Sequence, residues 1–414
     1  MNHPFFQVIS PQAFLEHLQT FPFVQDEWIP FQEGLGRVLA QDIQSPENLP
    51  QADRSSMDGF AVHAQDTFGA SPSNPAYLEN LSDLPIDALA SIPLERGNCM
   101  GITTGGTLPR GSNAVVMVEH TQKMGAGTIE IRQSVAPGDN IMLAGEDVTR
   151  GTTILPRGKR LRAQEIGLLA ALGITTIPVF KQVRAGIIST GDELVEVHET
   201  PRPGQIRDVN TSTLSCLLSR INAQAMPYGL VKDDLPSIVS ALEKGLADND
   251  ALFISGGSSV GTRDLTIEAI LSLPDAKILA HGVSISPGKP TILASVGDKP
   301  IMGLPGQITS AQVIMLVFGC PLLDHMGGHC QAMNTSRRPH IPAVLAANLP
   351  SKQGREDYVR VELGPSHEGK LPLAVPRTGK SGLIKTLIQS DGLVCIPATS
   401  EGMLAGTKVM VWML

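Results

Sequence analysis

A glycine-rich stretch, Phe253-Ile-Ser-Gly-Gly-Ser-Ser-Val-Gly-Thr-Arg-Asp264, decides how this chain is interpreted. Its apolar start is typical of a buried strand, which runs into a turn of glycines and serines that ends in an acid. Glycine lets the backbone approach a bulky anion closely, and bare amides and hydroxyls donate hydrogen bonds to it. The stretch therefore indicates a phosphate site, and an ordinary strand-to-helix loop is the alternative. The candidate contacts are Ser255, Gly256, Gly257, Ser258 and Gly261.

A second apolar strand, Ala185-Gly-Ile-Ile-Ser-Thr-Gly-Asp-Glu-Leu194, ends in the same kind of turn. The carboxyl ends of parallel strands open onto one crevice of an α/β sheet. We therefore expect Ser189, Thr190 and Gly191 to lie beside the first turn, with the carboxylates Glu193 and Asp264 in a shared pocket. Two further turns, Ser286-Pro-Gly-Lys-Pro290 and Gly303-Leu-Pro-Gly306, follow along the chain.

Strands and helices alternate through residues 181–329, which predicts a parallel sheet wrapped by helices. The expected strands are 183–188, 226–231 and 251–255, and the expected helices are 211–223, 235–246 and 265–273. Short alternating runs separated by turn residues predict a small β domain over 51–144, and polar short strands predict a β domain over 330–414. Between them, residues 163–172 have helical spacing with Gly173 as the C-cap.

Composition excludes several classes of protein. The 414 residues carry 32 basic and 40 acidic side chains, which gives a formal charge of −8. This net charge provides no general electrostatic attraction to nucleic acid or to anionic membranes. The five cysteines include no Cys-x-x-Cys pair, which argues against a disulfide framework or structural zinc. No Lys or Arg precedes Arg37, so we expect no secretory signal and a cytoplasmic protein. The apolar run 313–323 is too short to span a bilayer and predicts a core helix.

Taken together, the motifs resemble the molybdopterin molybdenumtransferases, the bacterial MoeA and gephyrin E-domain family. The ordered set is Ser-Met-Asp-Gly-Phe-Ala-Val (56–62), Ile-Thr-Thr-Gly (102–105), Ser-Thr-Gly-Asp-Glu-Leu (189–194), Gly-Gly-x-Ser-x-Gly-x-x-Asp (256–264), Pro-Gly-Lys-Pro (287–290) and Gly-Leu-Pro-Gly (303–306). The resemblance implies a multidomain α/β plus β protein with four parts. These are an elongated α+β linker domain (1–50 with 145–180), the small β domain (51–144), a doubly wound molybdopterin-binding α/β domain (181–329) and a C-terminal β-barrel-like domain (330–414).

The function implied by the resemblance is insertion of molybdenum from molybdate into adenylylated molybdopterin, with Mg²⁺ assisting and AMP released. It also implies a cytoplasmic homodimer, with transient contacts to the molybdopterin adenylyltransferase and to molybdoenzyme maturation proteins. One alternative is an adenylyltransferase, although those relatives are essentially the α/β module alone. The other is a non-catalytic scaffold of the same fold.

Individual residues acquire roles by matching the family motifs. The resemblance implies catalytic roles for Asp58, Thr104, Glu193, Asp264 and Lys289, and Mg²⁺ ligation by Glu193, Asp234 and Asp264. It adds cofactor contacts at Pro287, Gly288, Pro305, Gly306, Arg360 and Ser381. Taken alone, Asp58 is a turn aspartate and the Asp233-Asp234 pair caps a helix that begins at Leu235. Asp234 is chosen over Asp233 because it precedes Leu-Pro, and surface roles remain open for Arg360 and Ser381.

The chain also departs from the family pattern. Ser286 stands where relatives commonly carry Lys, Gln307-Ile308 stands for Asn-Pro, and Met142-Leu143 replaces basic residues before Gly-Glu-Asp. Several anion-binding charges are therefore absent, so divergent specificity or lost activity is a further alternative.

Overall fold

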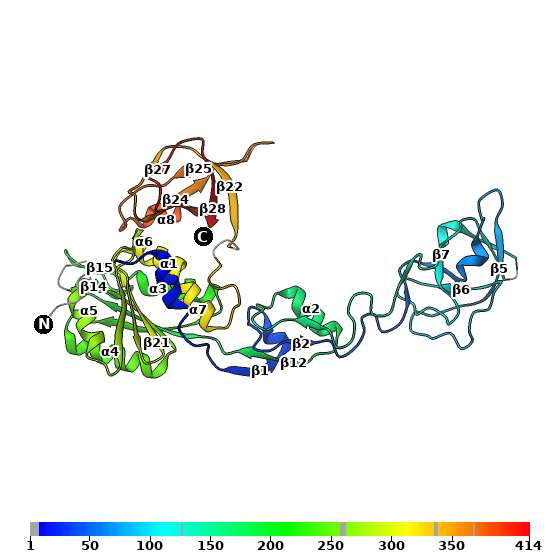
Figure 1. Ribbon diagram of the computed structural model, residues 1–414, viewed down its shortest axis with the longest axis horizontal. Coiled ribbons are helices and arrows are strands. Elements are labelled where there is room, and N and C mark those ends of the chain that lie inside the picture. Colours follow the sequence, from blue (N-terminus) through cyan, green and yellow to red (C-terminus); the bar gives the residue numbers. More distant parts are fainter. Residues whose placement is uncertain (1–7, 126, 257–261, 335–337, 367–368) are drawn as a thin grey trace. The chain divides into compact units, whose positions relative to one another are not determined.

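A computed structural model describes residues 8–125, 127–256, 262–334, 338–366 and 369–414, with the side chains of 262–264 left out (Figure 1). The chain forms two compact units. The first comprises Met1–Gln41, Arg157–Ile166 and Thr176–Leu414, and the second comprises Asp42–Pro156 and Gly167–Thr175. The finer division into four domains stays a prediction.

A six-stranded sheet forms the centre of the first unit, in the order β16-β13-β17-β21-β20-β18. The strands are β13 (Arg184–Thr190), β16 (Gln224–Val231), β17 (Ala251–Gly256), β18 (Ala276–His281), β20 (Ile292–Val296) and β21 (Lys299–Pro305). The neighbours β16, β13, β17 and β21 are parallel, which confirms the doubly wound α/β prediction.

One edge of the sheet is antiparallel, which the prediction of a parallel sheet did not include. Strand β20 pairs antiparallel with both β18 and β21. A tight turn at Gly297, whose φ is +56°, joins β20 directly to β21, and a hairpin of this kind leaves no chain for a crossover helix.

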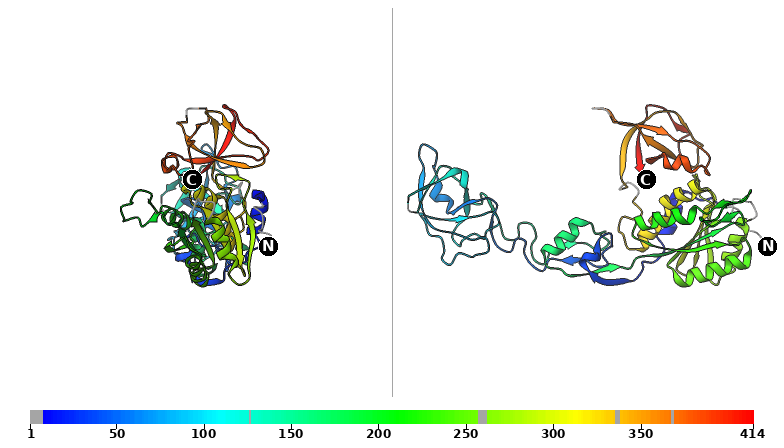
Figure 2. Two further views of the ribbon diagram at one scale, coloured as in Figure 1. Left: turned by 90° about the vertical axis from the view of Figure 1, so that its left-hand side faces the viewer. Right: turned by 180° about the vertical axis from the view of Figure 1, so that it is seen from behind.

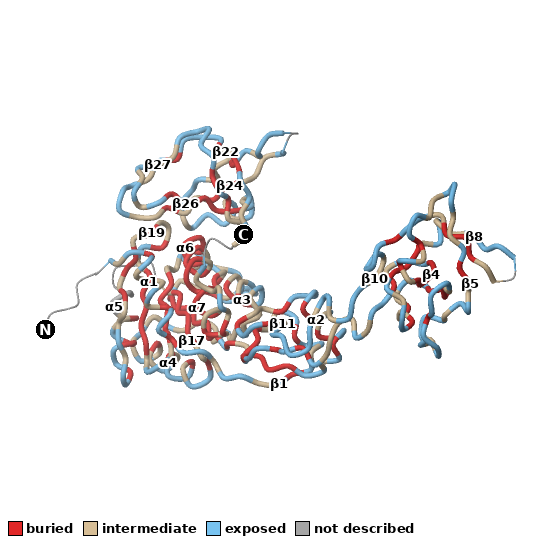
Figure 3. Tube along the Cα trace, turned by 45° about the vertical axis from the view of Figure 1, so that its right-hand side comes forward, coloured by how far each residue is buried: buried red, intermediate tan, exposed pale blue. Residues whose placement is uncertain are grey.

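Alternating side chains of the strands supply two cores, one on each face of the sheet. Ile187 and Phe253 pack on the face covered by α1 (Pro11–Leu18), α3 (Asn210–Arg220), α6 (Ile308–Ile314) and α7 (Cys320–Met326). Ile188 and Ile254 pack on the other face, against α4 (Leu235–Asp248) and α5 (Thr262–Leu271). The buried strands are visible in Figure 3. Both faces are therefore covered by helices, as a parallel sheet requires.

The predicted core helix is part of a longer one, in which α6, the π segment η4 (Met315–Gly319) and α7 run on without a break. The helix Ile308–Met326 has the length and hydropathy of a membrane span, but 78% of its most apolar window is buried inside the protein. The wide π turn precedes Pro321, where a proline lacks the N–H that a regular helix needs.

Residues 340–414 form a closed β-barrel. The strands β22 (His340–Leu345), β24 (Glu356–Leu363), β25 (Leu373–Pro376), β26 (Gly392–Ile396) and β28 (Lys408–Met413) pair in the order β24-β25-β22-β28-β26, and β26 pairs again with β24. Ala343, Val361, Val394 and Val411 fill the interior. The short strand β19 (Ile285–Ser286) pairs with β24, and α1, α6 and α7 lie between the sheet and this barrel (Figures 1 and 2).

The second unit is built around one β-sheet. Its six-stranded sheet has the order β7-β4-β6-β5-β9-β8, from β4 (Gly59–Val62), β5 (Ala76–Asp83), β6 (Asn98–Ile102), β7 (Ala114–Met117), β8 (Thr121–Met124) and β9 (Thr128–Ile131). Phe60 and Val62 of β4 lie in its larger core.

Short elements complete the described chain. They are β1 (Asp26–Pro30), η1 (Phe31–Gly34), β2 (Ile43–Gln44), β3 (Arg54–Ser55), η2 (Ala64–Thr67), η3 (Val118–His120), β10 (Ile141–Met142), β11 (Thr153–Leu155), α2 (Ala163–Ala171), β12 (Thr176–Phe180), β14 (Leu194–Val195), β15 (Ile206–Arg207), β23 (Leu349–Pro350), α8 (Ile384–Ile388) and β27 (Gly402–Met403). Helix α2 is followed by Gly173 at φ +65°, as its predicted C-cap role requires.

Candidate active site

A cavity of about 560 Å³ lies at the carboxyl ends of β13, β17 and β21. Parallel strands bring their ends to one edge, and the polar turns after them line the same space. The residues that line it are Thr190, Glu193, Leu194, Pro201, Gln205, Ile206, Arg207, Val209, Asn210, Ser255, Gly256, Gly306, Gln307, Ile308, Gly382 and Ile384. The shared pocket predicted for the first two turns therefore includes Thr190, Glu193, Ser255 and Gly256.

A chain of hydroxyl groups underlies this cavity. The Ser189 hydroxyl lies 3.2 Å from that of Ser255 and 3.0 Å from that of Thr211. Thr211 in turn donates to the Asp208 carboxylate at 2.5 Å. Asp208 also accepts from the backbone N–H groups of Asn210 and Thr211 at 3.0 and 3.2 Å, so it caps the start of α3. This network fixes the strand ends and the helix against each other.

Asn210 is held in one orientation by its own hydrogen bond. Its Nδ2 donates to the Gly306 carbonyl at 2.9 Å, so its Oδ1 must point the other way. The Asn210 Oδ1 and the Thr190 hydroxyl are both buried, and neither has a partner within the described part of the chain. Buried polar atoms of native proteins are normally paired, so a water molecule or a bound ligand in the cavity is expected to supply the missing partners.

Gly256 shows why the strand must end in glycine. A Cβ at this position would lie well within 3.0 Å of the Thr190 hydroxyl, closer than side chains tolerate. At the edge of the cavity, β17 therefore lies so close to Thr190 of β13 that a side chain at position 256 would clash with it. Gly257, Ser258 and Gly261 lie outside the described residues.

The acids divide between different roles. Glu193 lines the cavity. Asp234 is the N-cap of α4 and accepts from the Ser237 N–H at 2.9 Å, which lowers the pKa of Asp234. Burial, then the charges of Asp192, Glu193 and Asp234, raises the pKa of Asp233. The capping alternative thus describes Asp234, whereas the pKa of Asp233 is raised chiefly by burial and then by three neighbouring acids, Glu193 among them. Asp264 lies in α5, and its side chain is outside the described set.

The predicted contacts of the Pro-Gly-Lys turn and of the C-terminal part are not among the residues that line the cavity. Pro287, Gly288 and Lys289 connect β19 to β20, and the Lys289 side chain is exposed. Arg360 is buried, donates to the Gly379 carbonyl at 3.1 Å, and has its pKa lowered by burial. The Ser381 carbonyl accepts from the Thr309 N–H at 3.1 Å, and the next residue, Gly382, reaches the cavity. Pro305 ends β21 immediately before the cavity residue Gly306.

In the second unit, Asp58 and Thr104 form a compact pair. Asp58 Oδ1 accepts from the Thr104 N–H at 2.6 Å and from its hydroxyl at 3.0 Å. The backbone hydrogen bond, then the hydroxyl, lowers the pKa of Asp58. Both residues are exposed, so the carboxylate stays ionised and available to solvent at neutral pH.

Several cavity residues were missed by sequence reasoning. Asn210 lines the cavity, and Asp208 belongs to the hydrogen-bond network beside it. Both belong to Ile206-Arg-Asp-Val-Asn210, where an Asp at a helix start was a usable capping signal. Gly382 and Ile384 come from the C-terminal part, and no local pattern predicts their distant placement.

No group of three or more His, Cys, Asp or Glu side chains that could hold a metal ion occurs in the part of the chain that the structure describes. Any metal bound here would therefore need ligands from a substrate, from water or from residues outside that part.

Three family descriptions match the chain in order. The MoeA N-terminal region (domain I and II) matches residues 9–173, the probable molybdopterin binding domain matches 186–325, and the MoeA C-terminal region (domain IV) matches 342–414. The molybdopterin molybdenumtransferase 2 of Mycobacterium tuberculosis is 34% identical, over 93% of this chain and 94% of that protein. The molybdopterin molybdenumtransferase of Bacillus subtilis is 31% identical, over 94% and 90%.

A solved structure gives the same result for the fold. The molybdopterin biosynthesis MoeA protein from Pyrococcus horikoshii superimposes with a TM-score of 0.84 at 29% identity, covering 99% of this chain and all of that one.

Proposed function

Because this chain belongs to the molybdopterin molybdenumtransferase (MoeA) family, we propose that it transfers molybdenum from molybdate to adenylylated molybdopterin and releases AMP. It is a transferase of molybdenum cofactor biosynthesis. One observation carries the proposed chemistry: the 560 Å³ cavity lies in the segment that matches the molybdopterin-binding domain and is also lined by Gly382 and Ile384 of the C-terminal part. A nucleotidyl transferase made of the α/β module alone would have no such wall.

The cavity suits a flat heterocycle that carries a charged tail. Its volume falls within the range of about 300–1,000 Å³ typical of small-molecule sites. Ile206, Ile308 and Ile384 offer apolar surface to the faces of a ring. Asn210 and Thr190 bring polar atoms without partners among the described residues, which suits the donor and acceptor edge of a pterin.

The phosphates of the substrate would lie at the ends of β13 and β17. The hydroxyl of Ser255 is a donor of the kind that holds anions, and the glycine-rich motif that begins at Gly256 is expected from the sequence to add backbone N–H donors. Arg207 lines the same cavity and supplies a cation, and its Nε donates to the Glu199 carbonyl at 3.0 Å. These groups would stabilise the charge that develops as AMP departs.

Magnesium would be held mainly by the substrate. Mg²⁺ usually binds through one or two carboxylates together with phosphate oxygens and water, so Glu193 at the cavity fits the requirement, and Asp264 is the second ligand that the family motif implies. When bound, Mg²⁺ would neutralise part of the phosphate charge. Asp234 fits less well, because its carboxylate already caps α4.

The chemistry would be completed by a second copy of the chain. We infer a homodimer in which the Asp58 and Thr104 pair of one protomer reaches the cavity of its partner, because the pair is exposed and pre-ordered but belongs to a different compact unit. In a closed two-fold dimer each protomer would contribute its Asp58 and Thr104 pair to the cavity of the other, so the dimer would have two equivalent sites. We place the protein in the cytoplasm, with transient contacts to the adenylyltransferase that makes its substrate and to maturation proteins of molybdoenzymes.

Complementation tests the proposed function in a cell. A strain that lacks molybdenum insertion should regain molybdoenzyme activity when it expresses this chain, and Glu193→Ala should abolish the rescue without reducing the amount of folded protein. Failure of the unmodified chain at high molybdate would favour the scaffold alternative.

Subunit mixing tests the dimer separately. Asp58→Ala and Asp264→Ala chains should each be inactive. Their equal mixture should regain about a quarter of the activity, because random exchange makes about half of the dimers heterodimers and each heterodimer keeps one intact site of two. A mixture that exchanges subunits and stays inactive would refute the shared site while leaving the reaction itself untouched.

A further inference from the structure

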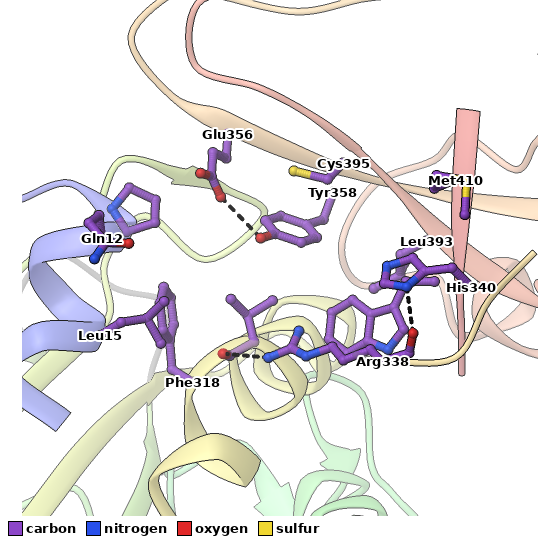
Figure 4. A pocket seen from close by; sticks show the side chains of 13 residues that line it. Gln12, Leu15, Phe318, Arg338, His340, Glu356, Tyr358, Leu393, Cys395 and Met410 are labelled. Carbon is purple, nitrogen blue, oxygen red and sulfur yellow. Dashed lines mark hydrogen bonds between the residues drawn. The ribbon is translucent and has the colours of Figure 1, made fainter. Parts of the chain in front are cut away.

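A second cavity, of about 320 Å³, lies where α1 and η4 face the C-terminal barrel. None of the residues that line it lines the candidate active site. Its walls are largely apolar and aromatic, and Figure 4 shows them converging from α1, from the long helix and from the barrel. The apolar lining consists of Pro11, Leu15, Val317, Phe318, Tyr358, Leu393, Met410 and Trp412.

Arg338 places a positive charge in this apolar setting. Its guanidinium lies 4.0 Å from the centre of the Trp412 ring and donates to the Val317 carbonyl at 3.4 Å. It forms no ion pair with any acid that the structure describes, and burial lowers the pKa of Arg338. The charge of Asp324 offsets part of the effect of burial, but the pKa of Arg338 is still lowered. A partly desolvated cation without a direct carboxylate partner is costly, and an incoming anion would reduce that cost.

The same cavity also contains one acid. The Tyr358 hydroxyl donates to Glu356 Oε2 at 3.0 Å, and the Tyr358 ring meets the Trp412 ring edge-on at 6.4 Å. Figure 4 shows Tyr358 between Glu356 and Arg338. The negative charge of Glu356 disfavours a multiply charged anion such as a phosphate, whereas a single carboxylate can form two parallel hydrogen bonds to the planar guanidinium.

We propose that this cavity is a second ligand site, which binds a small monocarboxylate with an aromatic or branched apolar body. The carboxylate pairs with Arg338, and the apolar body lies against Phe318, Tyr358 and Trp412. The volume is near the lower end of small-molecule sites, which limits the ligand to about the size of an aromatic acid. The site does not depend on the transfer reaction.

Tryptophan fluorescence reads this site directly. The chain has two tryptophans, and Trp28 is 63% exposed in β1, away from the cavity residues. In a Trp28→Phe background Trp412 is the sole reporter. Titration with 3-phenylpropionate should give a saturable change in emission, whereas the neutral 3-phenylpropanamide, of the same shape, should bind at least about tenfold more weakly. Equal affinity of acid and amide, or no saturable change, would overturn the proposal.

The second test removes the positive charge of Arg338 or the negative charge of Glu356, which should have opposite effects on binding. Arg338→Met should weaken 3-phenylpropionate binding by at least about tenfold, Arg338→Lys should keep part of it, and Glu356→Gln should tighten it by removing a like charge. Asn210→Ala, in the other cavity, is the matched control and should leave binding unchanged. Thermal melting checks that each variant is folded. Binding that survives Arg338→Met, weakens in Glu356→Gln or disappears in Asn210→Ala would contradict the assigned site.

Discussion

Replacement of Gly256 by alanine should destabilise the strand ends that form the candidate active site. The added Cβ would lie well within 3.0 Å of the buried Thr190 hydroxyl, so the Thr190 side chain or one of the two strands must move. Overpacking of this kind costs about 1–3 kcal/mol. Gly256 does not have a positive φ, so alanine recovers about 0.4–1 kcal/mol by restricting the unfolded chain. The net loss should therefore be about 1–2 kcal/mol.

Hydrogen exchange of peptides that cover β13 and β17 measures this loss where it arises. The steric cause is isolated by a double-mutant cycle, because Thr190→Ala removes the atom that the new Cβ meets. In the Thr190→Ala background, Gly256→Ala should cost almost nothing. Gly167 is the matched control: it lies inside α2, and a Cβ added there would meet no neighbouring heavy atom of the described residues within 4 Å, so Gly167→Ala should stabilise by about 0.5–1 kcal/mol. Equal losses for Gly256→Ala in both backgrounds would refute the steric reasoning.

Three further predictions concern charges. Thr104→Val removes one of the two hydrogen-bond donors to Asp58. The pKa of Asp58 should therefore rise towards its ordinary value but stay below it, because the backbone N–H of residue 104 remains. A carboxyl ¹³C NMR titration measures this pKa, and an unchanged pKa would exclude the hydroxyl as a cause. The Arg162 hydrogen bonds are the largest cause that lowers the pKa of Glu165 to about 2, so their stabilisation is fully present above the unfolded value of about 4.5 and is lost as the pH falls through about 2. The difference in melting temperature between the unmodified protein and Arg162→Met should accordingly shrink between pH 5 and pH 2, and a difference that is constant with pH would contradict this. Ser286→Lys should lower the molybdate concentration needed for half-maximal activity by up to about tenfold, because it adds a cation near Lys289; an unchanged dependence would mean that another cation, such as Arg207, already serves.

The sequence was sufficient for the elements whose local pattern decides them. The apolar runs before Ser189 and Ser255 are strands of the sheet, and Gly173 ends its helix, because periodicity and backbone freedom act over a few residues. The edge of the sheet was not predictable in this way. Whether β20 follows a crossover or a hairpin depends on its pairing partners, which are distant in sequence.

The candidate site was predictable where one motif supplies both the turn and the side chain. Thr190, Glu193, Ser255 and Gly256 therefore lie together as expected. Residues that reach the cavity from a distance, such as Ile384, depend on how the barrel packs against α6, which no local pattern encodes. For Asp234 the local capping rule is confirmed, because its carboxylate caps α4, and its role as a metal ligand stays a prediction.

Release of AMP from adenylylated molybdopterin by the purified protein tests the central claim most directly. With Mg²⁺ and molybdate present and no ATP added, we expect stoichiometric AMP and molybdenum cofactor, and we expect hydrolysis to depend on the oxyanion. The Glu193→Ala, Asp264→Ala double variant is the control and should release none. Consumption of ATP on free molybdopterin with release of pyrophosphate, or AMP release no greater than that of the control, would contradict the account.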